Sequence, residues 1–397
     1  MWRFFFRFIF YYYMPNRVLD TLKKDELYTI AKEKLNLLVT KSMTKTQIKE
    51  IVSKELNKKG PMKYVFPKVP VLIVIGDLHG DLEATIKALK MARVIDMNLP
   101  NETKDIRKIN WKGGKTVVVQ LGDQIDRVRP ANLVNSLCPE DDEDLVRDEG
   151  SDLKIMLLFS KLANQASQAG GAVYSILGNH ELMNVDGDFR YVSPKEFREF
   201  GNYFKEARNS DNRIPYGYIS RKRAFAPGGT LAKHLASDRH SVLVVGSWLF
   251  VHGGITPQIA SNFLLKDINL YIRRWLDGAK DTKTMAYVNS VYHNDDENFS
   301  PFWTREFSDL EEWNPMKHNR MFDETIGLIN KNNKLNVKGM VVGHSPQFNY
   351  SKGLNSACNN RLWRADVGMS KAFGECDDKN RCVQILVIKN DTEFIIL

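Results

Sequence analysis

Cysteine is scarce in this sequence. Its 397 residues include four cysteines, and no two of them stand at the Cys-x-x-Cys spacing. This scarcity argues against a zinc ribbon and against the disulfide framework of small secreted domains. With 25 glycines and 14 prolines, the chain is also far from a collagen-like or low-complexity composition. We therefore expect a globular protein of a reducing, cytoplasmic compartment.

Long apolar runs are missing as well. No segment reaches the length of about 20 apolar residues that a membrane-spanning helix needs. Residues 1–13 are strongly aromatic but contain Arg3 and Arg7, and they lack the small-residue cleavage site of a secretory signal. They could lie on a membrane surface. The simpler interpretation is that Met14 is the working start and that 1–13 is an untranslated or disordered leader, so we expect no membrane partner.

Basic charge gathers near the N-terminus. Of a net charge of +9, residues 14–60 contribute eleven basic and six acidic side chains. Apolar residues recur at helical spacing over 27–35 and 48–56, with Thr44 and Gln47 placed as a capping box. Residues 14–60 loosely resemble SAP-like helical modules of nucleic-acid proteins. We expect a small helical appendage that contacts nucleic acid or protein, the alternative being a hairpin packed on the rest of the chain.

From residue 69 onward, short apolar runs each end in polar residues and glycine. The runs cover residues 71–75, 116–121, 172–177, 248–251 and 339–342. Such runs are typical of buried strands, and layered α/β folds bind ligands at the carboxyl ends of their strands. We therefore predict an α/β fold with a site at these strand ends. Two further runs, 386–388 and 394–396, are expected to close the second sheet of the fold.

The polar side chains at the strand ends form a set of metal-ligand type. They are two carboxylates, one amide and three imidazoles, namely Asp77, Asp123, Asn179, His79, His252 and His344. The set contains no thiolate, which favours manganese, iron or zinc. A carboxylate between two half-sites would bridge them and give a two-metal centre, which holds a hydroxide and polarises a phosphoryl group from both sides. A single strand followed by one such polar residue is commonplace, but five strands that end in this way in one chain indicate a site.

The order of the motifs carries a family resemblance. GDLHG, GDQIDR, GNHE, HGG and GHS follow one another along the chain. In this order they resemble the calcineurin-like metallophosphoesterases, and more narrowly the phosphoprotein phosphatase family. The flanking FVHGGITP, FWTRE and WRADVGMS are most similar to its Shewanella-like, bacterial-type branch. The resemblance covers about residues 71–373 and implies an α+β sandwich of two mixed sheets flanked by helices, with a dimetal site at the carboxyl ends of the strands.

The sequence also departs from the family pattern at two positions. Val128 stands where most members have glycine, and Asp81 stands where many eukaryotic members have glutamine. These departures put the eukaryotic Ser/Thr subfamilies in doubt, but not the chemistry. Residues 61–397 would form the catalytic domain, with a cap insert at about 183–240.

The resemblance implies a role for each motif residue. One metal ion would be held by Asp77 and His79 and the second by Asn179, His252 and His344, with Asp123 binding both. His180 would be the general acid that protonates the leaving alkoxide, and Asp126 would orient its ring. Arg127 would bind the substrate phosphate. A second phosphate-binding arginine is expected between HGG and GHS, and Arg305 is our choice over Arg273, Arg274 and Arg320, with Arg190 as a helper.

These observations support a metal-dependent phosphomonoesterase that acts on phosphoproteins. The alternative enzyme is a dinucleoside polyphosphate or nucleotide hydrolase, because the branch of the superfamily that contains these hydrolases shares the same metal motifs. A third hypothesis, an inactive phosphatase that serves as a binding protein, is opposed by the intact set of ligands and acid.

Overall fold

The computed structural model describes residues 23–29, 31–32, 39–56, 62–129, 148–207, 214–311, 313–374 and 382–397. The chain divides into two compact units, Met1–Met62 and Lys63–Leu397. The aromatic leader at 1–13 lies outside the described residues. In the described part of the chain, no helix is both long and apolar enough to cross a membrane.

In the described part of the first unit there are two short α-helices, α3 (Lys24–Thr29) and α4 (Lys45–Leu56). The reciprocal capping bonds expected before α4 are present: the Thr44 amide donates to Gln47 Oε1 at 2.8 Å, and the Gln47 amide donates to Thr44 Oγ1 at 3.2 Å. Leu27 and Ile48 are fully buried. The two helices thus pack through an apolar contact, as their helical spacing of apolar residues predicted.

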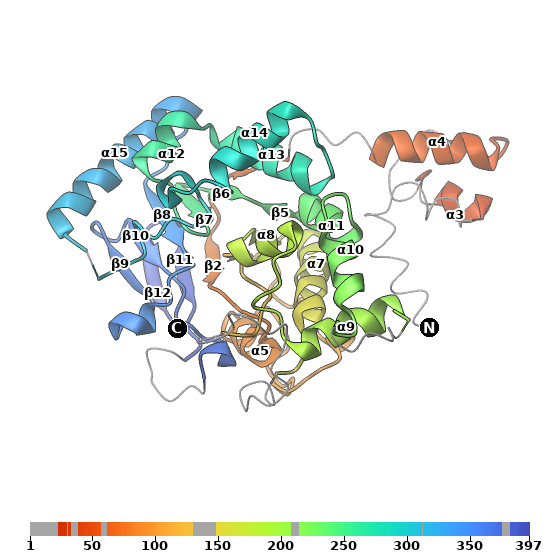
Figure 1. The fold of residues 1–397 in the computed structure, drawn as a ribbon, viewed down its shortest axis with the longest axis horizontal. Coiled ribbons are helices and arrows are strands. Elements are labelled where there is room, and N and C mark those ends of the chain that lie inside the picture. Colours follow the sequence, from red (N-terminus) through yellow and green to blue (C-terminus); the bar gives the residue numbers. More distant parts are fainter. Residues whose placement is uncertain are drawn as a thin grey trace. The chain divides into compact units, whose positions relative to one another are not determined.

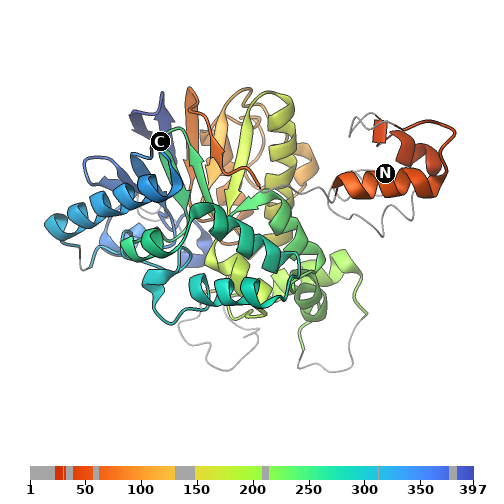
Figure 2. The same cartoon turned by 90° about the horizontal axis from the view of Figure 1, so that it is seen from above.

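The second unit is built on two six-stranded mixed sheets (Figures 1 and 2). The first sheet has the order β12-β11-β2-β3-β4-β5, in which β2 to β5 are parallel and β11 runs antiparallel to β2. The second has the order β1-β6-β7-β8-β10-β9. The strands are β1 (Val65–Phe66), β2 (Val71–Ile75), β3 (Val117–Gln120), β4 (Ala172–Ile176), β5 (Arg239–His240), β6 (Val242–Val245), β7 (Trp248–Val251), β8 (Gly339–Val342), β9 (Asn355–Ala357), β10 (Leu362–Arg364), β11 (Leu386–Lys389) and β12 (Glu393–Ile396).

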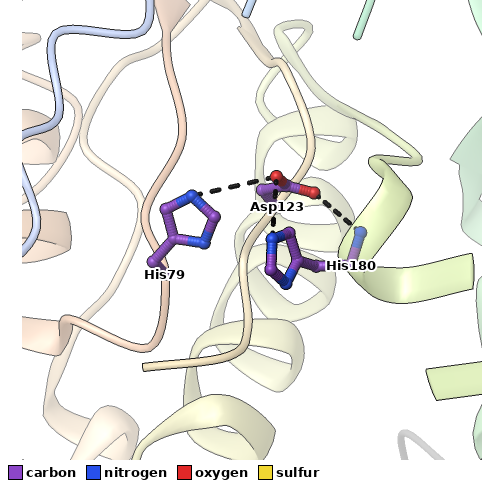
Figure 3. Close-up of side chains that lie close together, drawn as sticks. All are labelled: His79, Asp123 and His180. Carbon is purple, nitrogen blue, oxygen red and sulfur yellow. Dashed lines mark hydrogen bonds and ion pairs between the residues drawn. The ribbon is translucent and has the colours of Figure 1, made fainter. Parts of the chain in front are cut away.

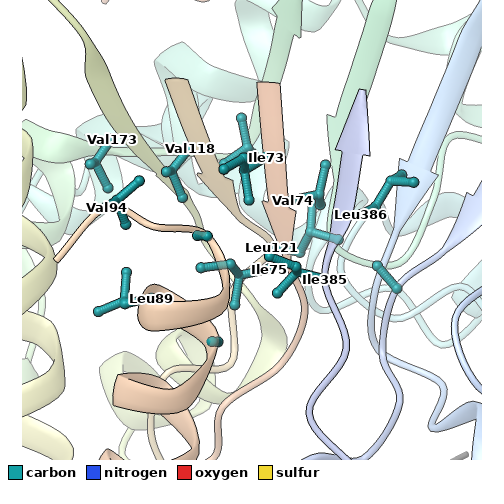
Figure 4. Close-up of a cluster of buried hydrophobic side chains, with 14 of the residues drawn as sticks. Ile73, Val74, Ile75, Leu89, Val94, Val118, Leu121, Val173, Ile385 and Leu386 are labelled. Carbon is teal, nitrogen blue, oxygen red and sulfur yellow. The ribbon is translucent and has the colours of Figure 1, made fainter. Parts of the chain in front are cut away.

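The two sheets share one buried core, and Figure 4 shows the part of it on and around the first sheet. Ile73 and Val118 come from the first sheet, whereas Phe250 and Val341 come from the second, and all four belong to the same cluster. A second cluster, which contains Leu249 of β7, lies on the other face of the second sheet. Since side chains alternate between the faces of a strand, apolar residues on both sides of β7 make it a strand covered on both faces.

The helices of this unit flank the sheets. They are α5 (Leu82–Met91), α7 (Asp152–Gln168), α8 (Asn179–Asp186), α9 (Pro194–Phe204), α10 (Tyr218–Phe225), α11 (Thr230–Asp238), α12 (Pro257–Asn262), α13 (Leu265–Leu276), α14 (Thr282–Val291) and α15 (Pro315–Asn333). α7 packs on β4, and α13 packs on β6. Within the segment expected to form a cap insert, residues 183–240, the described elements are the end of α8, α9, α10, α11 and β5.

All five apolar runs that end in polar residues are strands, as expected. The prediction for the last two runs was wrong in one respect: β11 pairs with β2 and β12 pairs with β11, so both join the first sheet instead of closing the second. An antiparallel strand can be added at either open edge, and its apolar residues do not specify which. The spacing of the cysteines did not predict a disulfide bond, but Cys382 forms one. Cys358 is a buried free thiol.

The first turn of α7 is capped by a side chain of another helix. The amides of Leu153 and Lys154 donate to the Glu199 carboxylate of α9, at 2.8 and 3.3 Å. Burial, opposed by the nearby Lys154 charge, raises the pKa of Glu199 to about 8. A carboxyl whose pKa is higher in the folded chain contributes stability at low pH that is lost as pH rises towards the folded value.

We therefore expect the native chain to lose stability between pH 6 and 8, and the Glu199→Gln variant to lose less. The difference is at most about 2–3 kcal/mol, since one pKa unit corresponds to about 1.4 kcal/mol. Urea unfolding of both proteins at the two pH values measures it. An identical pH dependence in the two proteins would show that Glu199 does not titrate in this range.

Candidate metal centre

The motif residues gather at the carboxyl ends of strands from both sheets. Asp77 and His79 follow β2, Asp123 and Asp126 follow β3, and Asn179 and His180 begin α8 directly after β4. His252 follows β7, and His344 follows β8. All eight side chains are buried. The structure thus brings together every residue that the sequence assigned to the metals and to the acid.

Four of these residues have a backbone conformation that side chains rarely adopt. The φ angles of His79, Asp123, Asp126 and His344 are 41°, 49°, 73° and 71°. Non-glycine residues in this region carry a conformational cost, which surrounding structure must offset, and such residues cluster at functional sites. The strand-to-loop turns are therefore held in shape by their contacts, among them the Leu78 and His79 amides, which both donate to the Asp123 carbonyl at 2.9 Å.

Asp123 is the residue that the imidazoles share. Its Oδ2 lies 3.3 Å from His252 Nε2, 3.8 Å from His79 Nε2 and 3.9 Å from His180 Nε2, and its Oδ1 accepts from the His180 amide at 3.0 Å. Figure 3 shows His79 and His180 converging on this carboxylate. Burial alone would raise the pKa of Asp123, but the His252, His180 and His79 charges hold it well below its usual range.

Among the residues that the structure describes, two groups of side chains have the spacing to hold a metal ion. One is His79, Asp123 and His180, and the other is Asp123, His252 and His344; within each group the ligand atoms all lie within 4.8 Å of one another. Asp123 belongs to both. Asn179 joins the second group through its Oδ1, which lies 2.8 Å from His252 Nε2. The shared carboxylate is the arrangement that a two-metal centre requires.

Asp77 is a buried carboxylate with one oxygen atom available to bind a cation. Its Oδ2 accepts from the His344 amide at 3.0 Å, but its Oδ1 is buried without a hydrogen-bond partner among the described residues. Burial and the neighbouring Asp366 charge raise the pKa of Asp77 well above its ordinary value. Buried carboxylates of this kind are normally paired or bound to metal. The donor set therefore fits divalent ions.

His180 is held by the next carboxylate of its motif. Its Nδ1 lies 2.8 Å from Asp126 Oδ2, and the Asn184 amide group donates to both Asp126 oxygens at 3.0 Å. A carboxylate on Nδ1 fixes the proton there and leaves Nε2 free to act towards the site.

Arg221 completes this arrangement, and no sequence motif pointed to it. It is fully buried on α10 and donates to Asp126 Oδ1 at 3.0 Å, Asp152 Oδ2 at 2.7 Å and Asn184 Oδ1 at 2.7 Å. Phe200 of α9 lies under its guanidinium at 4.7 Å. Burial raises the pKa of Asp152, and the Arg221 charge opposes that rise. One residue of the insert thus ties Asp126 to α7.

Removing this guanidinium should be costly. We expect Arg221→Met to lower the free energy of unfolding by about 3–5 kcal/mol, because it leaves buried carboxylates without their cation. Arg223→Met, on the exposed side of the same helix, is the matched control and should change stability by less than about 0.5 kcal/mol. Urea unfolding measures both. Equal stability of the two variants would contradict the role given to Arg221.

The three predicted phosphate-binding arginines differ in position. Arg305 lies beside a motif residue, with its Nη1 3.4 Å from the His344 carbonyl and 3.3 Å from Ser345 Oγ. Arg127 is buried and donates to Ser370 Oγ at 2.7 Å. The Arg190 side chain is 63% exposed and forms an ion pair with Asp188. The structure therefore brings Arg305 to the cluster, holds Arg127 in the wall and leaves Arg190 mostly in solvent.

Comparisons with known proteins agree with this geometry. The family described as calcineurin-like phosphoesterase matches residues 70–361. Shewanella-like protein phosphatase 2 of Arabidopsis thaliana is 32% identical over an alignment of 344 residues that covers 78% of this chain and 74% of that protein. Shewanella-like protein phosphatase 1 of Plasmodium berghei is 27% identical over 303 residues, 75% of this chain and 67% of that protein.

A solved structure shares the fold. The cold-active protein-tyrosine phosphatase of a psychrophilic Shewanella species aligns with a TM-score of 0.56 at 21% identity, over 84% of this chain and 80% of that one. At this identity the likeness concerns the fold alone.

Proposed function

Because the chain belongs to the calcineurin-like phosphoesterase family, and is therefore a hydrolase of phosphoesters, we propose that it is a protein phosphatase. Its substrates would be phosphoserine, phosphothreonine or phosphotyrosine side chains. The observation that carries the proposal is Asp123, shared by two metal-ligand groups with the His180–Asp126 pair beside it. The two relatives named as Shewanella-like protein phosphatases support the choice of a protein substrate.

We assign the ligands as the family resemblance implies. Asp77 and His79 would hold one ion, Asn179, His252 and His344 the other, and Asp123 both. When bound, two divalent ions supply an activated water and polarise a phosphoryl oxygen. Manganese, iron and zinc all suit oxygen and imidazole ligands, and the reloading experiment below chooses among them.

His180 would donate a proton to the departing oxygen. With Nδ1 bound to Asp126 at 2.8 Å, its Nε2 is the nitrogen that faces Asp123 and the half-sites. A serine or threonine alkoxide is a poor leaving group, so a proton delivered from Nε2 accelerates its departure. Asp126 keeps the proton on Nδ1 and so sets the direction of transfer.

Arg127 and Arg305 would bind the phosphate oxygens. Arg305 lies beside His344, and the buried Nε of Arg127 has no hydrogen-bond partner among the described residues, which leaves it a donor for substrate. A guanidinium binds a phosphate oxygen through charge-assisted hydrogen bonds. Arg190, mostly in solvent, could assist from the insert only if its pair with Asp188 opens.

A substrate panel tests the proposed function. Metal-stripped protein is reloaded with manganese, iron or zinc and assayed on peptides carrying each of the three phosphoresidues and on a dinucleoside tetraphosphate. We expect phosphate release from at least one phosphopeptide to be far faster than cleavage of the dinucleotide. The reverse order would favour a nucleotide hydrolase, and no turnover with any of the metals would indicate a binding protein.

Residues 14–60 are proposed as a separate helical module. A chain shortened to begin at Met62 should keep full activity on a small aryl phosphate, because the site residues all follow β1. Failure of the shortened chain to fold would show that the helices belong to the catalytic body. If the module contacts nucleic acid, the full chain should bind DNA or RNA with a steep salt dependence that the shortened chain lacks.

A further inference from the structure

The arginine that the family pattern assigns to phosphate is partly engaged elsewhere in this chain. Arg127 is 4% exposed, and its Nη1 donates to Ser370 Oγ and lies 3.5 Å from Asp81 Oδ2. Asp81 is one of the two departures from the family pattern, and its Oδ2 also accepts from the Lys371 amide at 2.8 Å. A carboxylate at this position holds the guanidinium in the wall, so Arg127 alone offers the substrate few donors.

Two residues further along the chain, Arg129 is placed differently. Its side chain is half-buried, and its Nη1 donates to the Asp126 and Val128 carbonyls at 3.0 and 2.9 Å. Among the described residues, its other guanidinium N–H groups have no hydrogen-bond partner. The backbone amide of Val128 donates to the Tyr191 carbonyl at 3.0 Å, which holds this segment in place. The bonds to the two carbonyls thus orient the guanidinium, and its remaining donors are not engaged by the described part of the chain.

Two aromatic rings place the Arg129 guanidinium next to the metal centre. It lies 4.8 Å from the Phe373 ring and 5.6 Å from the Tyr191 ring. Phe373 is in edge contact with His79 at 5.6 Å, and Tyr191 is in edge contact with His180 at 4.8 Å. The cation therefore sits between rings that each touch one imidazole of the first metal-ligand group.

The electrostatics agree with this position. After burial, the Arg129 charge is the main cause that lowers the pKa of His79. Burial lowers the pKa of Arg129, and the carboxylates that most oppose this lowering are those of Asp123, Asp126 and Asp366. A cation this close to the shared carboxylate lies within reach of an anion bound at the half-sites.

We propose that Arg129 binds the phosphoryl oxygens of a phosphomonoester, alongside Arg127 and Arg305, through the guanidinium donors that no described residue engages. The inference rests on the proposed function, since it concerns the same site. It adds a substrate-binding residue to those that the family resemblance assigned. A planar guanidinium with two adjacent donors suits the doubly charged phosphate of a monoester better than the singly charged phosphate of a diester.

Calorimetric titration with inorganic phosphate tests this without turnover. The metal-loaded full chain is compared with Arg129→Gln, Arg129→Lys and Arg127→Gln. Loss of a hydrogen bond between charged groups predicts phosphate binding about 10- to 100-fold weaker in Arg129→Gln. Arg129→Lys should bind phosphate more weakly than the native chain but more tightly than Arg129→Gln, because lysine keeps the charge but lacks the two adjacent N–H donors. Arg107→Gln, an exposed arginine paired with Asp105, is the control and should bind phosphate as the native chain does.

Metal content and kinetics separate substrate binding from other roles. Arg129→Gln should retain both ions and show a raised KM on a small aryl phosphate. Loss of metal from this variant, unchanged phosphate affinity, or a weakening smaller than in Arg127→Gln would overturn the inference. The outcome is distinguishable from failure of the proposed function: a native chain that binds phosphate but hydrolyses no phosphomonoester refutes the function while leaving the comparison at Arg129 intact.

Discussion

Replacing Asp123 with asparagine is expected to release metal from both half-sites at once. Asp123 is the one residue common to the two ligand groups, and its carboxylate is the negative charge on which His79, His180 and His252 converge. An amide of the same shape keeps one oxygen but removes the negative charge that would attract both cations. Mutation of a residue that only hydrogen-bonds to a metal ligand already lowers metal affinity about 10- to 100-fold. Loss of a bridging ligand should therefore lower the metal affinity of each half-site by at least about 100-fold.

Metal analysis of the reloaded and dialysed protein measures this effect. The matched control is His344→Ala, which changes one group only and should leave the ion held by Asp77, His79 and Asp123 in place. Two ions retained per chain in Asp123→Asn would contradict the bridging assignment, and one ion retained would assign Asp123 to a single half-site.

Replacing His180 with asparagine is expected to reduce activity in proportion to how poor the leaving group is. General acid catalysis contributes about 10²–10⁴-fold, and an alkoxide needs the proton whereas a nitrophenolate leaves almost unaided. The variant should therefore lose about 10²–10⁴-fold on phosphoserine peptides and much less on nitrophenyl phosphate. Both ions should stay bound, because Asp77, His79 and Asp123 remain for the first ion.

Asp126→Asn provides the matched control for this role. It leaves the His180 ring in place but cannot hold a proton on Nδ1 in the same way, so it should show the same dependence on leaving group. Equal losses of His180→Asn on both substrates would contradict proton donation. Release of an ion would instead make His180 a ligand, a role that its place in the first metal-ligand group also allows.

The sequence predicted the strand ends well, for a physical reason. A buried strand is a short apolar run, and the polar residues that follow it must either reach solvent or meet one another at the sheet edge. His79, Asp123 and His252 stand directly after such runs, so their convergence could be expected before any coordinates. Gly122, with φ of 96°, supplies the left-handed backbone conformation that follows β3.

Residues on helices of the insert could not be found this way. Arg221 looks like any basic residue of a polar helix, and only the packing of α10 against α8 and α9 brings it to Asp126, 95 residues earlier in the chain. Asp152, at the start of α7, also belongs to none of the sequence motifs. Buried charge networks depend on long-range packing, so periodicity in one segment carries no information about them.

The helices within residues 183–240 therefore help to position residues of the site. Arg221 of α10 fixes Asp126, and Glu199 of α9 caps the helix that carries Asp152. Both contacts bear on the position of His180, because Asp126 lies between Arg221 and the imidazole. Changes in these helices should accordingly alter proton transfer as well as stability.

Stoichiometric reloading tests the central claim most directly. Stripped protein is titrated with manganese, or with whichever metal the panel selects, while phosphate release from the best phosphopeptide is followed. The account predicts little activity at one equivalent and full activity at two, because both ligand groups must be filled around Asp123. Full activity at one equivalent, or hydrolysis that persists in stripped protein, would contradict a dimetal phosphatase.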